Sequence, residues 1–283
     1  MGTSRFLSFV FSACAMFFCH AGKSAGQILP RAARKPPTAG FVKSIGSDVA
    51  HVFSSPFHLS RKGRLRLLAF TAMATGMIVF VDEPFDEEYA KEGHNAFYLA
   101  HELAEVGQFY DDVTPAVFTA GLSAAMLAGG LISRDKKLLT TTRLLVEAAV
   151  LTQVFAAAAK GVLGRSRPYS DRGATDFNFF KFSSAEDYKS MPSGHVSSVF
   201  AIMTVMVKQY DHWWVEIPAY TFCAGVAFQR MESRNHWFSD TIVGGALGFW
   251  VASTLVHHNA GAAGESSLHP YLGRDRVGLA LSF

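Results

Sequence analysis

Long apolar segments dominate the chain, and their pattern predicts helices. The segments are rich in Ala, Leu and Gly and show little of the alternation between apolar and polar residues that marks a half-buried strand. They cover residues 67–81, 115–132, 144–159, 195–207, 213–228 and 240–256. A further amphipathic helix is expected at 95–109. The pattern therefore predicts an all-α fold, a helical bundle of about six core helices.

Two segments of different composition precede the bundle. Residues 1–25 hold Arg5, an apolar run and then small residues, which is typical of a secretory signal peptide or of an N-terminal membrane anchor. Residues 26–66 are rich in Lys, Arg, Pro, Gly and Ser, so we expect a basic linker with a short amphipathic helix near 47–53. We place the helical domain at 67–258 and a polar C-terminal tail at 259–283.

The apolar segments leave open whether the bundle is embedded in a membrane or soluble. Several are shorter than the roughly 18–20 apolar residues that a bilayer requires, and Glu147 and Gln153 interrupt one of them. If all the segments crossed a membrane, the basic loops would lie in the cytoplasm, whereas a cleaved signal peptide would place the residues before Leu67 outside. We expect an exported protein of the cell envelope, periplasmic or membrane-associated, with its active site facing away from the cytoplasm.

Charge and cysteine content narrow the function classes. The chain has 26 Lys and Arg against 23 Asp and Glu, and they are dispersed, which argues against a nucleic-acid-binding surface. Cys14 and Cys19 lie in the N-terminal segment, which leaves Cys223, and we expect it to be a small buried core residue.

The third apolar segment ends in a group suited to phosphate. Lys160, Arg167 and Pro168 form the pattern K-x6-R-P. Pro168 disfavours helical geometry at Arg167, and Gly161 and Gly164 loosen the turn. A compact ammonium and a forked guanidinium can then converge on the oxygens of one phosphate.

The fourth segment begins with a second group, P-S-G-H. The free N–H groups of a helix N-terminus point at an anion, and Gly194 lets the backbone approach closely. Ser193 can cap the helix and also donate its hydroxyl to an anion. His195 lies at the mouth of this site, where it can give a proton to a leaving group.

A third group, R-x5-H-x3-D, joins the fifth and sixth segments and consists of Arg230, His236 and Asp240. If the helix begins by His236, the Asp240 carboxylate lies on the same face one turn later. It can then keep one ring nitrogen of His236 protonated and turn the other toward a phosphorus atom. That is the arrangement of a nucleophile with its orienting acid.

In this order, and each at a helix end, the three groups resemble the type 2 phosphatidic acid phosphatase (PAP2) and vanadium haloperoxidase superfamily. The resemblance covers roughly residues 67–257, and three spaced groups are far more specific than one. It implies a PAP2/haloperoxidase-like bundle whose phosphate-binding residues are Lys160, Arg167, Ser193, Gly194 and Arg230. It implies a catalytic set in which His195 is the general acid, His236 the nucleophile and Asp240 its partner.

Three neighbouring residues need separate interpretation. Gln229 stands before Arg230, where the superfamily usually has a small residue, which puts the shape of the substrate in doubt. Arg234, in Ser233-Arg234, stands too close to His236 to take the role of Arg230. Arg165 lies beside Arg167 but off the pattern, so we interpret it as a charge at the rim of the site.

The residues and the resemblance together predict a metal-independent phosphatase that hydrolyses phosphate monoesters or diphosphates through a phosphohistidine. The favoured substrate is a lipid phosphate such as phosphatidate, with polyprenyl diphosphate, lipid A and small soluble phosphomonoesters left open. No cofactor is expected, and vanadate should bind as a mimic of phosphate. Membrane association is expected, and a nucleic-acid partner is not.

Other interpretations remain at this point. Taken singly, each residue of the three groups could be an ordinary helix-end charge or a surface histidine. The same anion pocket would also suit a vanadate-dependent haloperoxidase, or a non-catalytic envelope protein that binds phosphorylated lipid. The acidic residues between 82 and 88, and His101 with Glu102 and Glu105, lack the ligand spacing of known metal sites, so we expect solvated surface there.

Overall fold

The structure is a computed structural model, and it describes residues 41–89, 97–180, 182, 185–262, 267–272 and 277–282. The predicted signal peptide or anchor at 1–25 lies outside the described residues. The helices are α2 (Phe41–Ser54), α3 (Arg61–Phe80), α4 (Asp82–Tyr89), α5 (Tyr98–Val113), α6 (Pro115–Ser133), α7 (Lys136–Leu163), α8 (Gly194–Gln209), α9 (Trp213–Glu232) and α10 (Phe238–Ala262). Short 3-10 helices cover Ser55–His58, Pro168–Ser170 and Glu186–Tyr188.

The helical architecture confirms the predicted fold class for the bundle. In the C-terminal tail, β1 (Ser267–Leu272) and β2 (Val277–Ser282) form an antiparallel pair, in register from Ser267 opposite Ser282 to Leu272 opposite Val277. The sequence shows only weak alternation at 278–283, and its first strand carries Pro270, so the pairing was not predicted.

The chain divides into two compact units, one of residues 1–53 with 257–283 and one of residues 54–256. In the first unit, polar contacts join α2 to the end of α10. Asn259 Nδ2 donates to Asp48 Oδ1 at 2.8 Å, and the rings of His51 and His258 stack with centroids 4.1 Å apart. The helix predicted at 47–53 is part of α2, which is longer than the linker composition suggested because α2 begins at Phe41.

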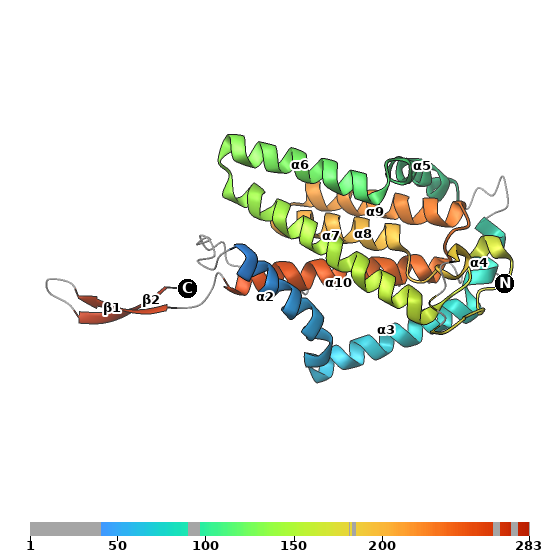
Figure 1. The fold of residues 1–283 in the computed structure, drawn as a ribbon, viewed down its shortest axis with the longest axis horizontal. Helices are drawn as coiled ribbons and strands as arrows, with labels where there is room; N and C mark the ends of the chain where they lie inside the picture. Colours follow the sequence, from blue (N-terminus) through green and yellow to red (C-terminus); the bar gives the residue numbers. More distant parts are fainter. Residues whose placement is uncertain are drawn as a thin grey trace. The chain divides into compact units, whose positions relative to one another are not determined.

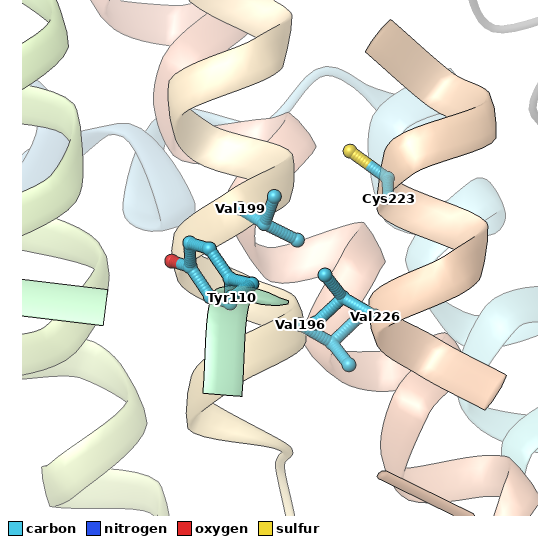
Figure 2. Packing of buried hydrophobic residues seen from close by; sticks show 5 residues of the cluster. All are labelled: Tyr110, Val196, Val199, Cys223 and Val226. Atoms are coloured by element: carbon cyan, nitrogen blue, oxygen red, sulfur yellow. The ribbon is translucent and has the colours of Figure 1, made fainter. Parts of the chain in front are cut away.

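The second unit is a helical bundle in which α5 packs on α9, α7 on α8, α8 on α9 and α6 on α7 (Figure 1). Figure 2 shows its core where α5, α8 and α9 meet: Tyr110 from α5, Val196 and Val199 from α8, and Cys223 and Val226 from α9. All five side chains are buried, and each of the three valines stabilises the fold by about 1.5–3 kcal/mol. Cys223 is a free, buried cysteine, which confirms the prediction.

Glycines bring α5 unusually close to α9. A Cβ added to Gly107 would lie 2.3 Å from the carbonyl oxygen of Gly225, and one added to Gly225 would lie 2.5 Å from that of Leu103. Any side chain at either position would therefore push the helices apart. The close crossing matters for the site, because it brings the C-terminal end of α5 next to that of α9.

Helices long and apolar enough to cross a membrane occur in four places among the described residues: Arg61–Phe80, Pro115–Ser133, Lys136–Leu163 and Phe238–Ala260. Only 11% of the apolar window of α3 or α6 is buried inside the protein, and Ile132 is 86% exposed. Exposed apolar surface on this scale fits contact with lipid. The segment predicted at 144–159 looked too short to cross a bilayer. Helix α7, which contains it, is long enough because it continues through polar residues at both ends.

Candidate active site

The ends of α7, α8, α9 and α10 that carry the three predicted groups meet at one place in the bundle. The Ser193 amide donates to the carbonyl oxygen of Asp240 at 3.1 Å, which ties the start of α8 to the start of α10. The carbonyl oxygen of Arg230 accepts from the amides of Asn235 and His236, both at 3.2 Å. The structure therefore brings the second and third groups together through their backbones.

Lys160 and Arg167 reach this place from the end of α7. The helix ends at Gly164, whose φ of 54° is left-handed, and a Cβ there would lie 2.2 Å from the carbonyl oxygen of Asn178. Arg167 then has extended geometry, with φ −85° and ψ 153°, as Pro168 predicts. The Nζ atom of Lys160 lies 3.6 Å from the position that a Cβ on Gly194 would take, so this ammonium faces the start of α8.

Ser193 occupies the N-cap position of α8, but its side chain makes no capping hydrogen bond. This differs from the expectation that its hydroxyl caps the helix. The side chain is fully buried, and its Oγ atom has no hydrogen-bond partner among the described residues. A buried hydroxyl without a partner is costly, so its position beside a helix N-terminus suits the binding of an anion.

His236 lies in the turn between α9 and α10 and is held by a backbone carbonyl. Its Nδ1 atom is 2.7 Å from the carbonyl oxygen of Ser190. A carbonyl can only accept, so Nδ1 carries the ring proton and Nε2 has the lone pair. Burial, and then the positive charges of Lys160 and Arg230, hold the pKa of His236 well below its usual range. The imidazole is therefore neutral and has one free nitrogen.

Asp240 is not the direct hydrogen-bond partner that the sequence predicted for His236. Helix α10 begins at Phe238, after His236, and the Asp240 carboxylate lies 3.9 Å from Nδ1 of His236. Its Oδ2 atom accepts from the Ser190 hydroxyl at 2.5 Å and from the Trp237 amide at 3.0 Å. Asp240 thus acts as a helix-capping carboxylate that fixes the Ser190 segment and places a negative charge near the ring.

Arg165 is not at the rim of the site, so that interpretation was wrong. Its side chain is fully buried and forms ion pairs with Asp240 at 2.6 Å and with Asp82 at 2.7 Å. Burial alone would lower the pKa of Arg165, but the Asp240 and Asp82 carboxylates raise it above its usual value. Asp82 was expected on a solvated surface and is instead buried. Besides its ion pair with Arg165, it accepts a hydrogen bond from the Ser239 amide at 2.9 Å.

Arg230 and His195 share a carboxylate that the sequence did not indicate. Asp111, near the end of α5, accepts from Nη1 of Arg230, and the same Oδ1 atom lies 3.2 Å from Nε2 of His195. Burial, and then the charge of Arg230, lower the pKa of His195 to about 4. Gln229, the departure from the superfamily pattern, is buried and donates to Asp111 Oδ2 at 3.2 Å.

Several donors in the site have no partner among the residues that the structure describes. Nε of Arg167, Nε of Arg230 and Oγ of Ser193 are buried and unpaired. A cavity of about 290 Å³ is lined by Lys160 rather than by these three donors, and its lining includes Phe182 and Tyr188. The arrangement can therefore hold a small polyvalent anion and leaves room for an organic group beside it.

Arg234 is directed elsewhere, as its spacing predicts, because its guanidinium pairs with Asp86 at 2.8 Å and with Asp171 at 3.0 Å. Within the described part of the chain, no group of three His, Cys, Asp or Glu side chains is placed to hold a metal ion. Ser190, Arg165 and Asp111 were missed, and no motif could have found them. Ser190 acts through its backbone carbonyl, and the sequence does not indicate whether an arginine or aspartate such as Arg165 or Asp111 is buried.

Comparison with known proteins gives a consistent picture. Residues 141–261 match the family model of the PAP2 superfamily. The chain is 31% identical to the lipid A 1-phosphatase of Rhizobium etli over 116 residues, which are 40% of this chain and 48% of that protein. It is 28% identical to the lipid A 1-phosphatase of Porphyromonas gingivalis over 81 residues, 25% of this chain and 18% of that protein. The alignments thus span less than half the length of these curated relatives.

Among solved structures, the chain is similar to LpxE of Aquifex aeolicus, with a TM-score of 0.44, 17% identity, and coverage of 62% of this chain and 95% of that chain. It is also similar to a PAP2 type phosphatidylglycerolphosphate phosphatase of Bacillus subtilis, with a TM-score of 0.39, 14% identity, and coverage of 83% and 98%. The match contains all three motif groups, from Lys160 to Asp240, whereas Asp82 and Asp111 lie outside it. The similarity to the PAP2 superfamily thus lies in residues 141–261, the part of the chain that carries the three motif groups.

Proposed function

We propose that this protein is a membrane-associated phosphatase that removes a phosphate group from a lipid through a phosphohistidine at His236. The observation that carries the proposal is the set of buried, unpaired donors on Ser193, Arg167 and Arg230, close to a neutral imidazole with a free nitrogen. Three cations and a helix N-terminus suit a phosphoryl group, and the imidazole supplies a nucleophile. The name shared by the curated relatives puts lipid A 1-phosphate first among the substrates to test, with phosphatidate next.

The proposed reaction has two in-line displacements. Nε2 of His236 attacks phosphorus, the bond from phosphorus to the ester oxygen breaks, and His195 gives its proton to that oxygen. A water molecule then attacks the phosphohistidine, its proton passes to His195, and orthophosphate leaves. Lys160, Arg167 and Arg230 stabilise the charge on the equatorial oxygens during both steps. Nδ1 of His236 keeps its proton throughout because the Ser190 carbonyl accepts it.

His195 can donate a proton at neutral pH only if the bound substrate raises its pKa. In the structure the pKa of His195 is lowered to about 4, first by burial and then by Arg230. A bound phosphate group brings negative charge next to the same imidazole and offsets the arginine. The substrate therefore raises the pKa of its own proton donor, and His195 becomes protonated as the phosphate binds.

Exposed aromatic side chains near the site support a lipid substrate. The segment between α7 and α8 carries Phe179, Phe180 and Phe182, which are 58%, 67% and 72% exposed. Phe182 also lines the cavity next to Lys160. Exposed apolar rings of this kind suit contact with the boundary between lipid headgroups and acyl chains, so this end of the bundle would lie at that depth. We propose that it faces away from the cytoplasm, in keeping with the N-terminal segment of the sequence.

The test is to trap the phosphoenzyme. The detergent-solubilised protein is quenched during turnover of a 32P-labelled lipid phosphate, and acid-labile label is counted in the wild type, in His236→Ala and in His212→Ala. His212 precedes α9, at the other end of that helix from the site, and serves as the matched control. We expect label and turnover in the wild type and in His212→Ala, and neither in His236→Ala. Label that persists in His236→Ala would refute the phosphohistidine, and bound lipid without turnover in the wild type would indicate a binding protein.

A further inference from the structure

The carboxylate of Asp111 contacts the side-chain nitrogen atoms that Arg230 and His195 would use in the proposed mechanism. Its Oδ1 atom accepts from Nη1 of Arg230 and lies 3.2 Å from Nε2 of His195. Arg230 is a proposed phosphate ligand, and His195 is the proposed proton donor. A phosphate group bound by both residues would need the space and the donors that this carboxylate uses.

The surrounding contacts show that this position is built into the fold. Gln229 Nε2 donates to Asp111 Oδ2 at 3.2 Å and to Gln108 Oε1 at 3.0 Å, so α9 holds Asp111 and its neighbour one turn earlier on α5. The close approach of Gly107 to Gly225 sets the distance between these helices. The Asp111 side chain is nevertheless 29% exposed, so it can turn away from the site without unpacking a helix.

We propose that Asp111 is an internal anion that competes with phosphate for Arg230 and His195, and so sets how tightly the site holds its substrate and product. The inference rests on the proposed phosphatase function. Three cations gathered around a helix N-terminus would bind orthophosphate strongly, and a tightly bound product slows turnover. A carboxylate that returns to Arg230 as phosphate leaves keeps the cation paired and lowers the affinity for phosphate.

The substrate overcomes this competitor by two means. A phosphate monoester carries about −1.5 to −2 charge near neutral pH and three strong acceptor oxygens, against one charge and two oxygens on the carboxylate. It can also pair with the unpaired Nε atoms of Arg167 and Arg230 and with Ser193 Oγ, which Asp111 does not contact. The lipid part adds affinity that orthophosphate lacks, so the substrate still binds in spite of the competitor, whereas orthophosphate is held only weakly.

The experiment compares Asp111→Asn with Asp112→Asn. Asp112 is the next residue on α5 and is exposed, and its carboxylate accepts from Gln108 Nε2 at 2.6 Å. The two variants lose the same charge on the same helix, but only Asp111 contacts the site. Competitive inhibition constants for orthophosphate are measured against p-nitrophenyl phosphate in detergent, and orthophosphate binding is measured separately by calorimetry. Asp111→Ser serves as a second neutral variant, and thermal unfolding checks that each variant is folded.

We expect orthophosphate to bind Asp111→Asn and Asp111→Ser at least about tenfold more tightly than the wild type, and Asp112→Asn to behave like the wild type. Unchanged or weaker phosphate binding in both Asp111 variants would overturn the inference. So would a loss of kcat confined to substrates with poor leaving groups, because Asp111 would then assist proton donation by His195. A wild type that binds phosphate but turns over no phosphomonoester would refute the proposed function, while the calorimetry would still test Asp111.

Discussion

Arg165 is a fully buried charge that pairs with two buried carboxylates, and its removal tests the structure directly. Replacing it with Met, which has a similar length and no charge, removes hydrogen bonds to Asp82, Asp240, Ser239 and the carbonyl oxygen of Ala174. The Asp82 and Asp240 carboxylates then stay buried without their cation. Breaking a buried ion pair from one side costs about 3–5 kcal/mol, because the remaining charge is uncompensated.

The expected effect is large enough to measure by thermal unfolding in detergent. For a unit of this size, 1 kcal/mol changes Tm by about 2–4 °C, so Arg165→Met should lower Tm by roughly 6–20 °C. Arg172→Met is the matched control, because Arg172 lies in the same segment, is 41% exposed and meets Asp187 at 3.5 Å. Such a surface pair contributes about 0–1 kcal/mol, so the control should lose about 4 °C at most.

A double variant separates lost charge pairing from lost packing. Adding Asp82→Asn to Arg165→Met removes one of the two uncompensated charges, so the double variant should be more stable than Arg165→Met alone. Turnover should fall in both, because Asp240 orients Ser190 and hence His236. The reasoning is refuted if Arg165→Met loses no more Tm than the Arg172→Met control, since removing a buried cation with two carboxylate partners should cost several kcal/mol of stability.

Three further outcomes follow from the site and the fold. Gly107→Ala should lower both stability and turnover, because its Cβ would lie 2.3 Å from the carbonyl oxygen of Gly225; Tm and kcat check this, and a wild-type kcat would contradict it. Sulfate binding at pH 6 should take up a proton, because the anion offsets the charge of Arg230 and raises the pKa of His195 from about 4. Sulfate binding should therefore strengthen as the pH falls. Calorimetry in buffers of different ionisation enthalpy checks this, and it should find no proton uptake in His195→Asn. Phosphatase activity should survive dialysis against EDTA, and a loss that zinc or magnesium restores would argue for a metal mechanism.

Much of the site could be predicted from the sequence because its residues stand at helix ends. Patterns with a fixed number of residues, such as R-x5-H-x3-D, place side chains in one short turn, and Arg230 and His236 are indeed joined by their backbones. Antiparallel neighbours in a bundle put alternate connections at the same end, so the meeting of the second and third groups also followed from the order of the segments. The effect of Pro168 on Arg167 is local in the same sense.

What the sequence left undecided were the partners of those residues. Asp240 and His236 are four residues apart, yet the helix begins only at Phe238. Nδ1–H of His236 donates its hydrogen bond to the Ser190 carbonyl oxygen instead, and no pattern of side chains indicates such a backbone partner. Arg165, Asp82 and Asp111 look like any surface charges in a sequence. Their burial and pairing depend on which helices cross and how closely, and that is decided by long-range packing such as the contact of Gly107 with Gly225.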